Sequence, residues 1–347
     1  MKKKILHILN TSSYSGAENV AITIINNMNS DYECAYASMD GLIRSVLDKN
    51  GITFLPIAKM SIREIKRIIA IYKPDIIHAH DFTASIVSSL STSKIPIISH
   101  IHNNSPWIKT YHPYSFAYFL TAMKCKKILG VSESVFSEYV FGRIIKNKSF
   151  VVSNPINISV IKNNAKRAPE SNCSYDIVFL GRLATQKNPQ RFIKIISDLA
   201  RELPDIKVAI IGSGELKIEC SKLIEDYRLE NNIEMLGFMV NPYGVLAASK
   251  ILCMTSEWEG FGLVAVEALS LGVPVVASDV GGLPGIVNNK CGALCKHDDE
   301  FILEINLLLN DENYFDTKSK EAIIQAEKLE NIDIYTSKIH EIYTEIV

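Results

Sequence analysis

The stretch SEWEGFGLVAVEALSLGVPVVASDVGG, residues 256–282, places a loop, a helix and a strand in one continuous run. Glu259 lies in a polar loop and is followed by Gly-Phe-Gly, after which the apolar pattern from Leu263 predicts a helix. VPVVAS is an apolar run of strand length, and a second glycine pair follows it. A buried strand directly after an apolar helix is typical of a parallel sheet with helices on its faces.

The same alternation of strands and helices extends along the whole chain. Helical patterns such as SIREIKRIIAIY separate apolar runs of strand length. Strands are expected at residues 3–10, 34–38, 52–57, 75–80, 96–102, 126–132, 149–154, 175–181, 207–212, 233–238, 250–255 and 273–278. This order predicts two doubly wound, Rossmann-like α/β domains in tandem.

The domain boundaries follow from where the alternation is interrupted. The polar segment 157–174 shows little periodicity and is the expected linker. It separates an amino-terminal domain, residues 1–158, from a carboxyl-terminal domain, residues 175–325. Residues 326–347 are expected to form a terminal helix that packs across both domains, because no further strand follows them.

The composition is that of an ordinary globular protein of about two domains, with 347 residues of which 47% are hydrophobic and 22% charged. No apolar run approaches the ~20 residues of a membrane span. The start, MKKKILHILN, predicts a first strand rather than a signal peptide. Seven cysteines without a C-x-x-C pair fit reduced thiols and a cytoplasmic location.

The net charge of −1 conceals an asymmetry, since residues 1–165 carry 19 Lys and Arg against 10 Asp and Glu. A basic first half would suit a phosphorylated acceptor or an anionic membrane surface, or it could simply dock an acidic second domain. The aromatic segment 107–130, with Lys124, Lys126 and Lys127, could lie on the inner face of the plasma membrane. Alternatively, its aromatic residues are the core of one helix.

Polar residues after the strands of the first half are candidate ligand contacts, because open parallel sheets bind ligands beyond the carboxyl ends of their strands. Gly16 precedes a helix whose first N–H groups favour an anion, although such a glycine often only shapes a turn. His102 is expected at the cleft, where imidazole can bond a hydroxyl or phosphate. His78, His80 and His100 lie nearby, but no Cys or Glu joins them at ligand spacing, so no metal is expected.

The second half offers two cations after its first strand. Arg182 follows that strand and Lys187 precedes a helix near Pro189, an arrangement that suits a diphosphate or leaves two solvated surface cations. Gly212 follows the next strand, in a GSGE motif that lacks the third glycine of a dinucleotide fingerprint.

The Gly-Phe-Gly loop and the helix after it are suited to binding a phosphate group. Gly260 and Gly262 let backbone amides face a ligand, and the helix from Leu263 offers its positive end to phosphate. Glu267, on the second turn of that helix, could accept hydrogen bonds from two ribose hydroxyls or be a solvated carboxylate on the helix surface.

The spacing of Glu259 and Glu267 resembles the E-x7-E signature of the retaining glycosyltransferases of family 4, which have the two-domain GT-B architecture. YSGAEN, GRLATQKN and EGFGLVAVEALSLGVPVVASDVGG occur in the order expected for that family, so the resemblance covers essentially the whole chain. One departure is Gly285, where many members carry a glutamate after the glycine pair.

The resemblance implies a role for each matching residue. Arg182 and Lys187 would bind the donor diphosphate, Glu267 the ribose, and Glu259 would lie near the transferred sugar. The remaining donor-site residues would be those of the two glycine loops and the Gly-Phe-Gly loop, namely Gly16, Gly212, Gly260, Phe261, Gly262 and Leu263. His102 would line the cleft from the first domain.

The activity implied is transfer of a hexose or N-acetylhexosamine from a nucleotide sugar, UDP-linked rather than GDP-linked, with retention of configuration. The acceptor would be a hydroxyl of a growing surface glycan, such as capsule or O-antigen, carried on a polyprenyl diphosphate. No D-x-D motif occurs, so neither a metal nor another cofactor is expected, and nucleic acid is not an expected partner. The alternatives are a GT-B epimerase or phosphorylase, and a catalytically silent sugar-nucleotide binder.

Overall fold

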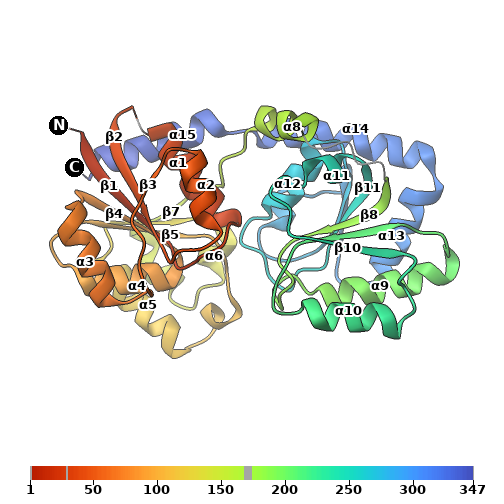
Figure 1. Cartoon of the computed structure of the whole chain (residues 1–347), viewed down its shortest axis with the longest axis horizontal. Helices are drawn as coiled ribbons and strands as arrows, with labels where there is room; N and C mark the ends of the chain where they lie inside the picture. The colour runs from red at the N-terminus through yellow and green to blue at the C-terminus, as the bar shows by residue number, and fades with distance from the viewer. Residues whose placement is uncertain (1, 29, 168–173, 347) are drawn as a thin grey trace. The chain divides into compact units, whose positions relative to one another are not determined.

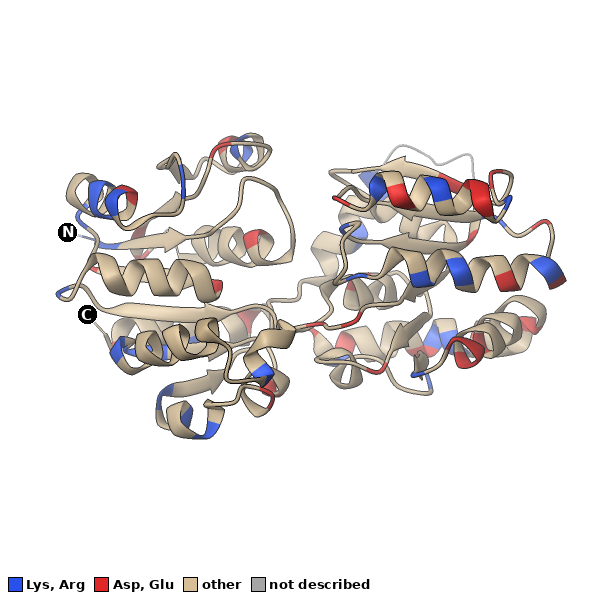
Figure 2. Ribbon diagram, turned by 90° about the horizontal axis from the view of Figure 1, so that it is seen from below, with Lys and Arg blue, Asp and Glu red and all other residues tan. Residues whose placement is uncertain are grey.

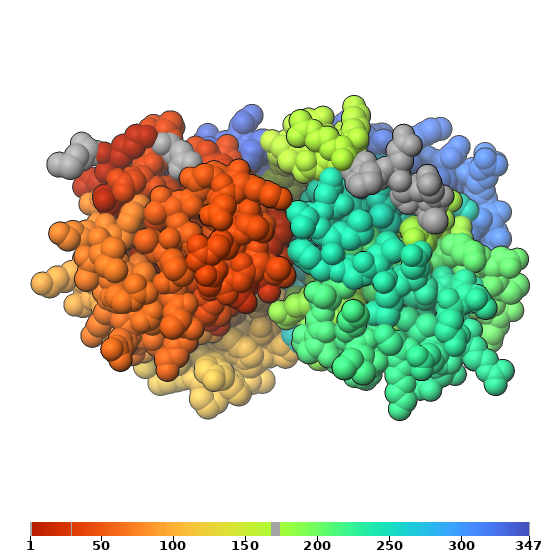
Figure 3. Space-filling model, in the orientation of Figure 1, coloured from red at the N-terminus to blue at the C-terminus, as the bar shows by residue number. Residues whose placement is uncertain are grey.

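The computed structural model describes residues 2–28, 30–167 and 174–346 (Figures 1 and 3). The chain divides into two compact units, one formed by Met1–Pro155 with Asn331–Val347 and the other by Ile156–Glu330. Each unit is built on one sheet in which every paired strand is parallel to its neighbour. The predicted α/β class with two doubly wound sheets is therefore confirmed.

The first unit contains a seven-stranded sheet in the order β3-β2-β1-β4-β5-β6-β7. Its strands are β1 (Lys3–Ile8), β2 (Tyr32–Ala37), β3 (Thr53–Phe54), β4 (Ile76–His80), β5 (Ile97–Ile101), β6 (Lys127–Gly130) and β7 (Ser149–Val151). The strand order changes direction at β1, which pairs with β2 on one side and β4 on the other. Ligands of such sheets bind beyond the carboxyl ends of the strands at this point.

Helices connect the strands of this unit, and one arrives from the end of the chain. The connecting α-helices are α1 (Gly16–Met28), α2 (Ile43–Lys49), α3 (Ile62–Tyr72), α4 (Asp81–Ser91), α5 (Pro113–Lys124), α6 (Glu133–Ser137) and α7 (Gly142–Ile145). The terminal helix α15 (Ile332–Thr344) also belongs to this unit and packs beside α1 (Figure 1).

Helix α3 shows how local sequence sets these elements. Ser61 caps its start by accepting a hydrogen bond from the Glu64 N–H (3.4 Å). Ile65, Ile68 and Tyr72 recur at helical spacing and are buried, which confirms the helix predicted from SIREIKRIIAIY.

The second unit contains a six-stranded sheet in the order β10-β9-β8-β11-β12-β13. Its strands are β8 (Tyr175–Leu180), β9 (Val208–Ile211), β10 (Ile233–Gly237), β11 (Ser249–Met254), β12 (Val275–Ser278) and β13 (Gly292–Cys295). Its helices are α8 (Ile158–Arg167), α9 (Pro189–Glu202), α10 (Lys217–Asp226), α11 (Tyr243–Ala247), α12 (Leu263–Ser270), α13 (Asp298–Asn310) and α14 (Glu312–Leu329). The order reverses at β8, between β9 and β11.

Two features of the second unit differ from the sequence prediction. The expected linker 157–174 is helical over its first part, α8, because the Asn157 Oδ1 caps the Val160 N–H (3.2 Å) and Ile158 and Ile161 are buried. Strand β13 was not predicted, since four residues beginning with Gly292 are too short to give a periodic signal. The rest of the expected linker, residues 168–173, lies outside the described residues.

Six cysteines are free and buried, namely Cys34, Cys125, Cys220, Cys253, Cys291 and Cys295, and Cys173 lies outside the described residues. Among the described helices, none combines the length and the apolar character that crossing a membrane requires.

Tyr343 connects α15 to the sheet of the first unit, and its replacement by Phe should destabilise that unit. The Tyr343 hydroxyl lies 2.7 Å from His78 Nδ1, and neither residue is exposed. Tyr343→Phe leaves a buried ring nitrogen without this partner, so we expect the free energy of unfolding to fall by about 1–3 kcal/mol. Thermal unfolding of the full chain measures this loss. Tyr111→Phe is the control, because Tyr111 is 81% exposed, and an equal shift in both variants would contradict the assignment.

Candidate functional site

The candidate site of the second unit is formed by the loops that follow β8 and β11. These two strands are neighbours, with Ile177 opposite Ile251 and Val178 opposite Leu252. Both loops therefore leave the same edge of the sheet, at the point where the strand order reverses.

Hydrogen bonds hold the two loops together. The Gln186 side chain donates to the Trp258 carbonyl (3.2 Å), and the Glu257 N–H donates to the Gln186 carbonyl (2.9 Å). The Thr255 hydroxyl donates to the Asn188 carbonyl (2.8 Å). These contacts fix the spacing between residues that are about 70 positions apart in sequence.

Lys187 and Glu259 meet in this region. The Lys187 Nζ lies 2.5 Å from Glu259 Oε2, with side-chain exposures of 17% and 11%. The Ser256 hydroxyl also donates to Glu259 Oε2 (3.3 Å). Arg182 follows β8 and is exposed, and its guanidinium makes no hydrogen bond or ion pair with a described residue. One predicted cation is thus paired with a predicted carboxylate, while the other faces solvent.

Gly262 directly precedes helix α12, as its N-cap, with a backbone φ of +104°, in the region that favours glycine. The Gly262 carbonyl accepts from the Ala265 N–H (3.0 Å). The amides of Leu263 and Val264 donate no hydrogen bond to a described residue. An anion can be bound by such amides at a helix start, so this geometry is suited to phosphate.

The second glycine pair packs against the carbonyl groups of the same loop. The Gly282 N–H donates to the Glu259 carbonyl (3.0 Å), and Gly281 has a φ of +57°. A Cβ atom at Gly281 would lie 1.8 Å from the Glu259 carbonyl oxygen. The glycines after β12 are therefore required for the backbone of the Glu259 loop to lie where it does.

Glu267 lies on the second turn of α12 and is only partly exposed. The Tyr243 hydroxyl donates to Glu267 Oε1 (2.9 Å). Burial raises the pKa of Glu267, although this hydrogen bond and the charge of Lys187 oppose the shift. Tyr243 was not identified from the sequence, because nothing in the YG pair at the start of α11 indicates a partner for the carboxylate.

The remaining predicted residues of this unit also lie near strand ends. The Gly212 N–H, directly after β9, donates to the Gly237 carbonyl (2.8 Å). Phe261 is 8% exposed and Gly260 is buried. Gly285, at the position of the missing glutamate, has no atom within 4 Å of a Cβ built on it. The role of each in donor binding stays a prediction.

In the first unit, Gly16 is the exposed first residue of α1, directly after the loop that follows β1. The same first turn holds Glu18, which is buried and accepts a hydrogen bond from the Ser15 hydroxyl. The predicted position of Gly16 at a helix start is confirmed.

His102 follows β5 and is partly exposed. Its backbone N–H donates to Asp81 Oδ1 (2.9 Å), and its ring Nε2 lies 2.9 Å from His80 Nδ1. Burial lowers the pKa of His102 to about 3 and raises that of Asp81 to about 7. His102 is therefore a neutral imidazole at physiological pH, able to accept or donate one hydrogen bond.

The sequence analysis missed one histidine of this region. His7 on β1 is buried, and its Nδ1 lies 3.0 Å from His80 Nε2. Burial lowers the pKa of His7 to about 3, and the pKa values of His78, His80 and His100 lie well below their usual range for the same reason. The sequence carried no signal for His7, because only the strand order shows that β1 pairs with β4 and brings His7 opposite His78.

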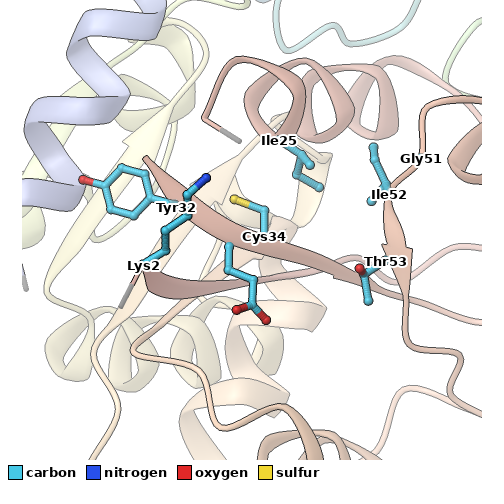
Figure 4. A pocket seen from close by; sticks show the side chains of 8 residues that line it. Lys2, Ile25, Tyr32, Cys34, Gly51, Ile52 and Thr53 are labelled. Atoms are coloured by element: carbon cyan, nitrogen blue, oxygen red, sulfur yellow. The ribbon is translucent and has the colours of Figure 1, made fainter. Parts of the chain in front are cut away.

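A pocket of about 420 Å³ lies elsewhere in the first unit (Figure 4). Tyr32, Glu33 and Cys34 at the start of β2 line it together with Thr53 of β3. Burial raises the pKa of the Cys34 thiol to about 12, so the thiol is protonated and a poor nucleophile. None of the predicted site residues lines this pocket, which lies near the beginnings of the strands rather than their carboxyl ends.

Two family models match the chain, and they meet within the described helix α8. The model of Glycosyltransferase Family 4 matches residues 14–160, and that of Glycosyl transferases group 1 matches residues 161–329. Together they cover residues 14–329, which include Gly16, the four histidines predicted near the strand ends, and all the predicted residues of the second unit.

Individual relatives agree with these matches. An uncharacterised glycosyltransferase of Methanocaldococcus jannaschii is 28% identical over 245 residues, which are 62% of this chain and 58% of the relative. The UDP-Gal:alpha-D-GlcNAc-diphosphoundecaprenol alpha-1,3-galactosyltransferase of Escherichia coli is 26% identical over 280 residues, 71% of this chain and 68% of the relative. The match thus spans little more than half of the archaeal relative's own length.

A solved structure supports the fold. The crystal structure of Anabaena Alr3699/HepE in complex with UDP and glucose superposes with a TM-score of 0.85 at 20% identity, over 99% of each chain. The fold of this chain is accordingly that of the GT-B glycosyltransferases, as the resemblance implied.

Substitution of Gly281 should disturb the loop that carries Glu259. In Gly281→Ala the new Cβ meets backbone that cannot turn aside, and the left-handed φ adds about 1–2 kcal/mol of strain. We expect a lower melting temperature and weaker binding of nucleoside diphosphate. Gly285→Ala is the matched control, because it has space for a Cβ and no positive φ. Equal behaviour of the two variants would mean that the glycine pair does not position the loop.

Proposed function

Because the chain belongs to the glycosyltransferases that join a family 4 amino-terminal half to a group 1 carboxyl-terminal half, we propose that it transfers a sugar from a nucleotide sugar to a hydroxyl of a glycan. The observation that carries this proposal is the arrangement around Lys187 and Glu259 at the reversal point of the second sheet. A cation, a carboxylate and unpaired helix amides lie there within one pair of linked loops.

UDP is the favoured nucleotide, and a hexose or N-acetylhexosamine the favoured sugar. The E. coli relative is named for a UDP-galactose donor, and the Anabaena structure contains UDP and glucose. Glu267 is suited to two adjacent ribose hydroxyls, because its carboxylate is held by Tyr243 and partly buried.

The acceptor we propose is a glycan linked to a polyprenyl diphosphate, in the assembly of a surface polysaccharide such as O-antigen or capsule. Support comes from the E. coli relative, whose name gives a diphosphoundecaprenol-linked acceptor. The excess of basic residues in the first unit, 19 Lys and Arg against 13 Asp and Glu, suits an anionic acceptor. In the second unit, acidic and basic residues are interspersed over the helices (Figure 2).

The reaction is proposed to proceed with retention of configuration and without a metal. The bond between the anomeric carbon and the diphosphate breaks with its electron pair passing to the phosphate oxygen. The acceptor hydroxyl bonds to the anomeric carbon on the same face, and its proton passes to the departing phosphate. Arg182, Lys187 and the amides at the start of α12 would stabilise the developing charge, and His102 would hydrogen-bond the sugar.

Incubation of the purified protein with candidate nucleotide sugars tests this function directly. Transfer requires both donor and acceptor, whereas an epimerase changes the donor alone and a phosphorylase needs inorganic phosphate. We expect product only with a glycan-diphosphate-lipid acceptor, and its anomeric configuration by NMR should match that of the donor. Turnover of the donor without any acceptor would overturn the proposal in favour of an epimerase.

Glu267 is expected to contribute to nucleotide affinity rather than to chemistry. Glu267→Ala should weaken the binding of UDP by about 10–100-fold, since charged hydrogen bonds contribute about 1.5–3 kcal/mol each. Tyr243→Phe keeps the carboxylate and removes one of its partners, so a smaller loss is expected. Calorimetry with UDP measures both affinities. An unchanged affinity in Glu267→Ala would remove the ribose assignment.

We also propose that helix α5 docks on an anionic membrane surface. Its buried positions include Ser115, Tyr118 and Thr121, whereas Phe116 and Leu120 are 54% and 51% exposed. Tyr118 is part of the core, as the alternative expected, but the helix also presents apolar side chains outward. Aromatic residues at an interface with cations nearby are typical of peripheral membrane binding.

The cations around α5 differ in part from those expected. Lys124 and Lys126 are exposed, as are Arg143 and Lys146 beyond the helix. Lys127, which was expected to face head groups, forms an ion pair with Glu345 (2.6 Å) and is partly buried. We assign the membrane contact to the exposed cations, since each contributes about 1 kcal/mol near an anionic surface.

Flotation with liposomes tests this surface. The protein should float with anionic vesicles at low salt and less at higher salt, because the Debye length is only ~10 Å at about 0.1 M. Phe116→Ser combined with Leu120→Ser should abolish flotation while leaving the fold intact. Ile218→Ser on α10 is the control, because Ile218 is 85% exposed but lies in the other unit. Absence of wild-type flotation with anionic vesicles at low salt would exclude the membrane proposal.

A further inference from the structure

Five of the eight histidines of the chain lie on one face of the first sheet. His7 on β1 is opposite His78 on β4, and His80 is opposite His100 on β5. Alternate residues of a strand share a face, so His78 and His80 point to the same side, as do His100 and the following His102. The rings are close enough to stack, with centroids 4.5 Å apart for His78 and His80.

In His7 and His78, both ring nitrogens take part in hydrogen bonds. His7 lies between His80 and the Tyr343 hydroxyl, which is 3.4 Å from His7 Nε2. His78 lies between Tyr343 (2.7 Å) and His100 Nδ1 (3.2 Å). His7 therefore contacts one ring nitrogen of His80, and His78 contacts one ring nitrogen of His100.

Of the other three histidines, His80 also has both ring nitrogens engaged, by His7 and His102, whereas His100 and His102 each leave one ring nitrogen unused. His100 Nε2 and His102 Nδ1 are buried without a hydrogen-bond partner among the described residues. One nitrogen from each of His80, His100 and His102 lies within 4.8 Å of the corresponding nitrogen in the other two. Zn²⁺ binds imidazole nitrogen at about 2.0–2.1 Å, which separates tetrahedral ligands by about 3.4 Å. Small rotations of the rings would therefore bring the three nitrogens onto one ion.

We propose that His80, His100 and His102 form a binding site for a divalent transition-metal ion, with Zn²⁺ as the best match. Three imidazoles without a carboxylate suit Zn²⁺, Co²⁺ or Ni²⁺, whereas Mg²⁺ and Ca²⁺ require oxygen ligands. A fourth coordination position stays open, as in zinc sites that bind water or a substrate.

The surrounding contacts are those that metal-bound histidines need. With His100 bound through Nε2, its Nδ1–H donates to His78 Nε2, and His78 in turn contacts Tyr343. With His80 bound through Nδ1, its Nε2–H donates to His7 Nδ1. Partners of this kind fix the tautomer and the ring orientation of a ligand. Binding of the ion would break the hydrogen bond that joins His80 to His102 (2.9 Å).

A second group, His7, His78 and His80, is also close enough to hold an ion. Every ring nitrogen of these three residues already has a hydrogen-bond partner. Binding there would break the contacts to Tyr343 and gain no unused nitrogen. The group at the carboxyl ends of β4 and β5 is therefore favoured, and partly exposed His102 gives it an entry side.

Cobalt titration of the full chain tests the site without reference to enzyme activity. After removal of metals with a chelator, Co²⁺ should bind at one equivalent and produce the visible absorption of a low-coordinate nitrogen site. His102→Ala should lower the Co²⁺ affinity at least tenfold, and His7→Gln, which removes an orienting partner, by about tenfold. His112→Ala is the control, because His112 is exposed at the start of α5 and should leave the affinity unchanged.

Three results would overturn the proposal: no saturable uptake by the wild-type chain, an unchanged affinity in His102→Ala, or an equal loss in His112→Ala. X-ray absorption on the Zn²⁺-loaded wild-type chain provides a readout that needs no variant. It should show three imidazole ligands, and fewer than three would also overturn the assignment. Because these readouts are spectroscopic and need neither nucleotide nor acceptor, their outcome does not depend on the proposed sugar transfer.

Discussion

The contact between Lys187 and Glu259 is the interaction around which the second unit is arranged. It joins the loop after β8 to the loop after β11, at the strand pair where the sheet reverses its order. Removal of either partner would leave a poorly solvated charge, which costs more than the pair itself contributes to stability. The side chains of Gln186 and Thr255 hydrogen-bond to backbone carbonyls across the two loops and so keep them at a fixed distance. The glycines after β12 leave the space that the Glu259 loop needs.

This pair also preorganises the proposed donor site. An ammonium paired with a carboxylate is kept in place, so little side-chain entropy is lost when a diphosphate competes for it. Arg182 remains exposed, and the first amides of α12 are unused by described residues. A preorganised set of donors of this kind stabilises charge that develops on a leaving group. The metal site inferred in the first unit uses none of these residues.

The sequence predicted those parts of the structure that depend on local pattern. The alternation of strands and helices, the start of α12 at Leu263 and the place of Glu267 on its second turn all follow from periodicity and glycine positions. What it could not predict depends on strand order and on contacts between distant segments. His7 joins the other histidines only because β1 pairs with β4, and Tyr343 reaches them from the last helix of the chain. Strand β13 was missed because it has only four residues, and helix α8 because its few apolar residues lie in a polar segment expected to be a linker.

The central claim is that Lys187 and Arg182 stabilise the departing diphosphate of a nucleotide sugar. Its most direct test is the turnover of the double variant Arg182→Ala and Lys187→Ala, compared with its affinity for the intact donor. The account predicts that kcat falls by a much larger factor than donor affinity, since the contacts strengthen as charge develops in the transition state. Equal losses of turnover and affinity would contradict it and would leave these residues as ground-state binding groups.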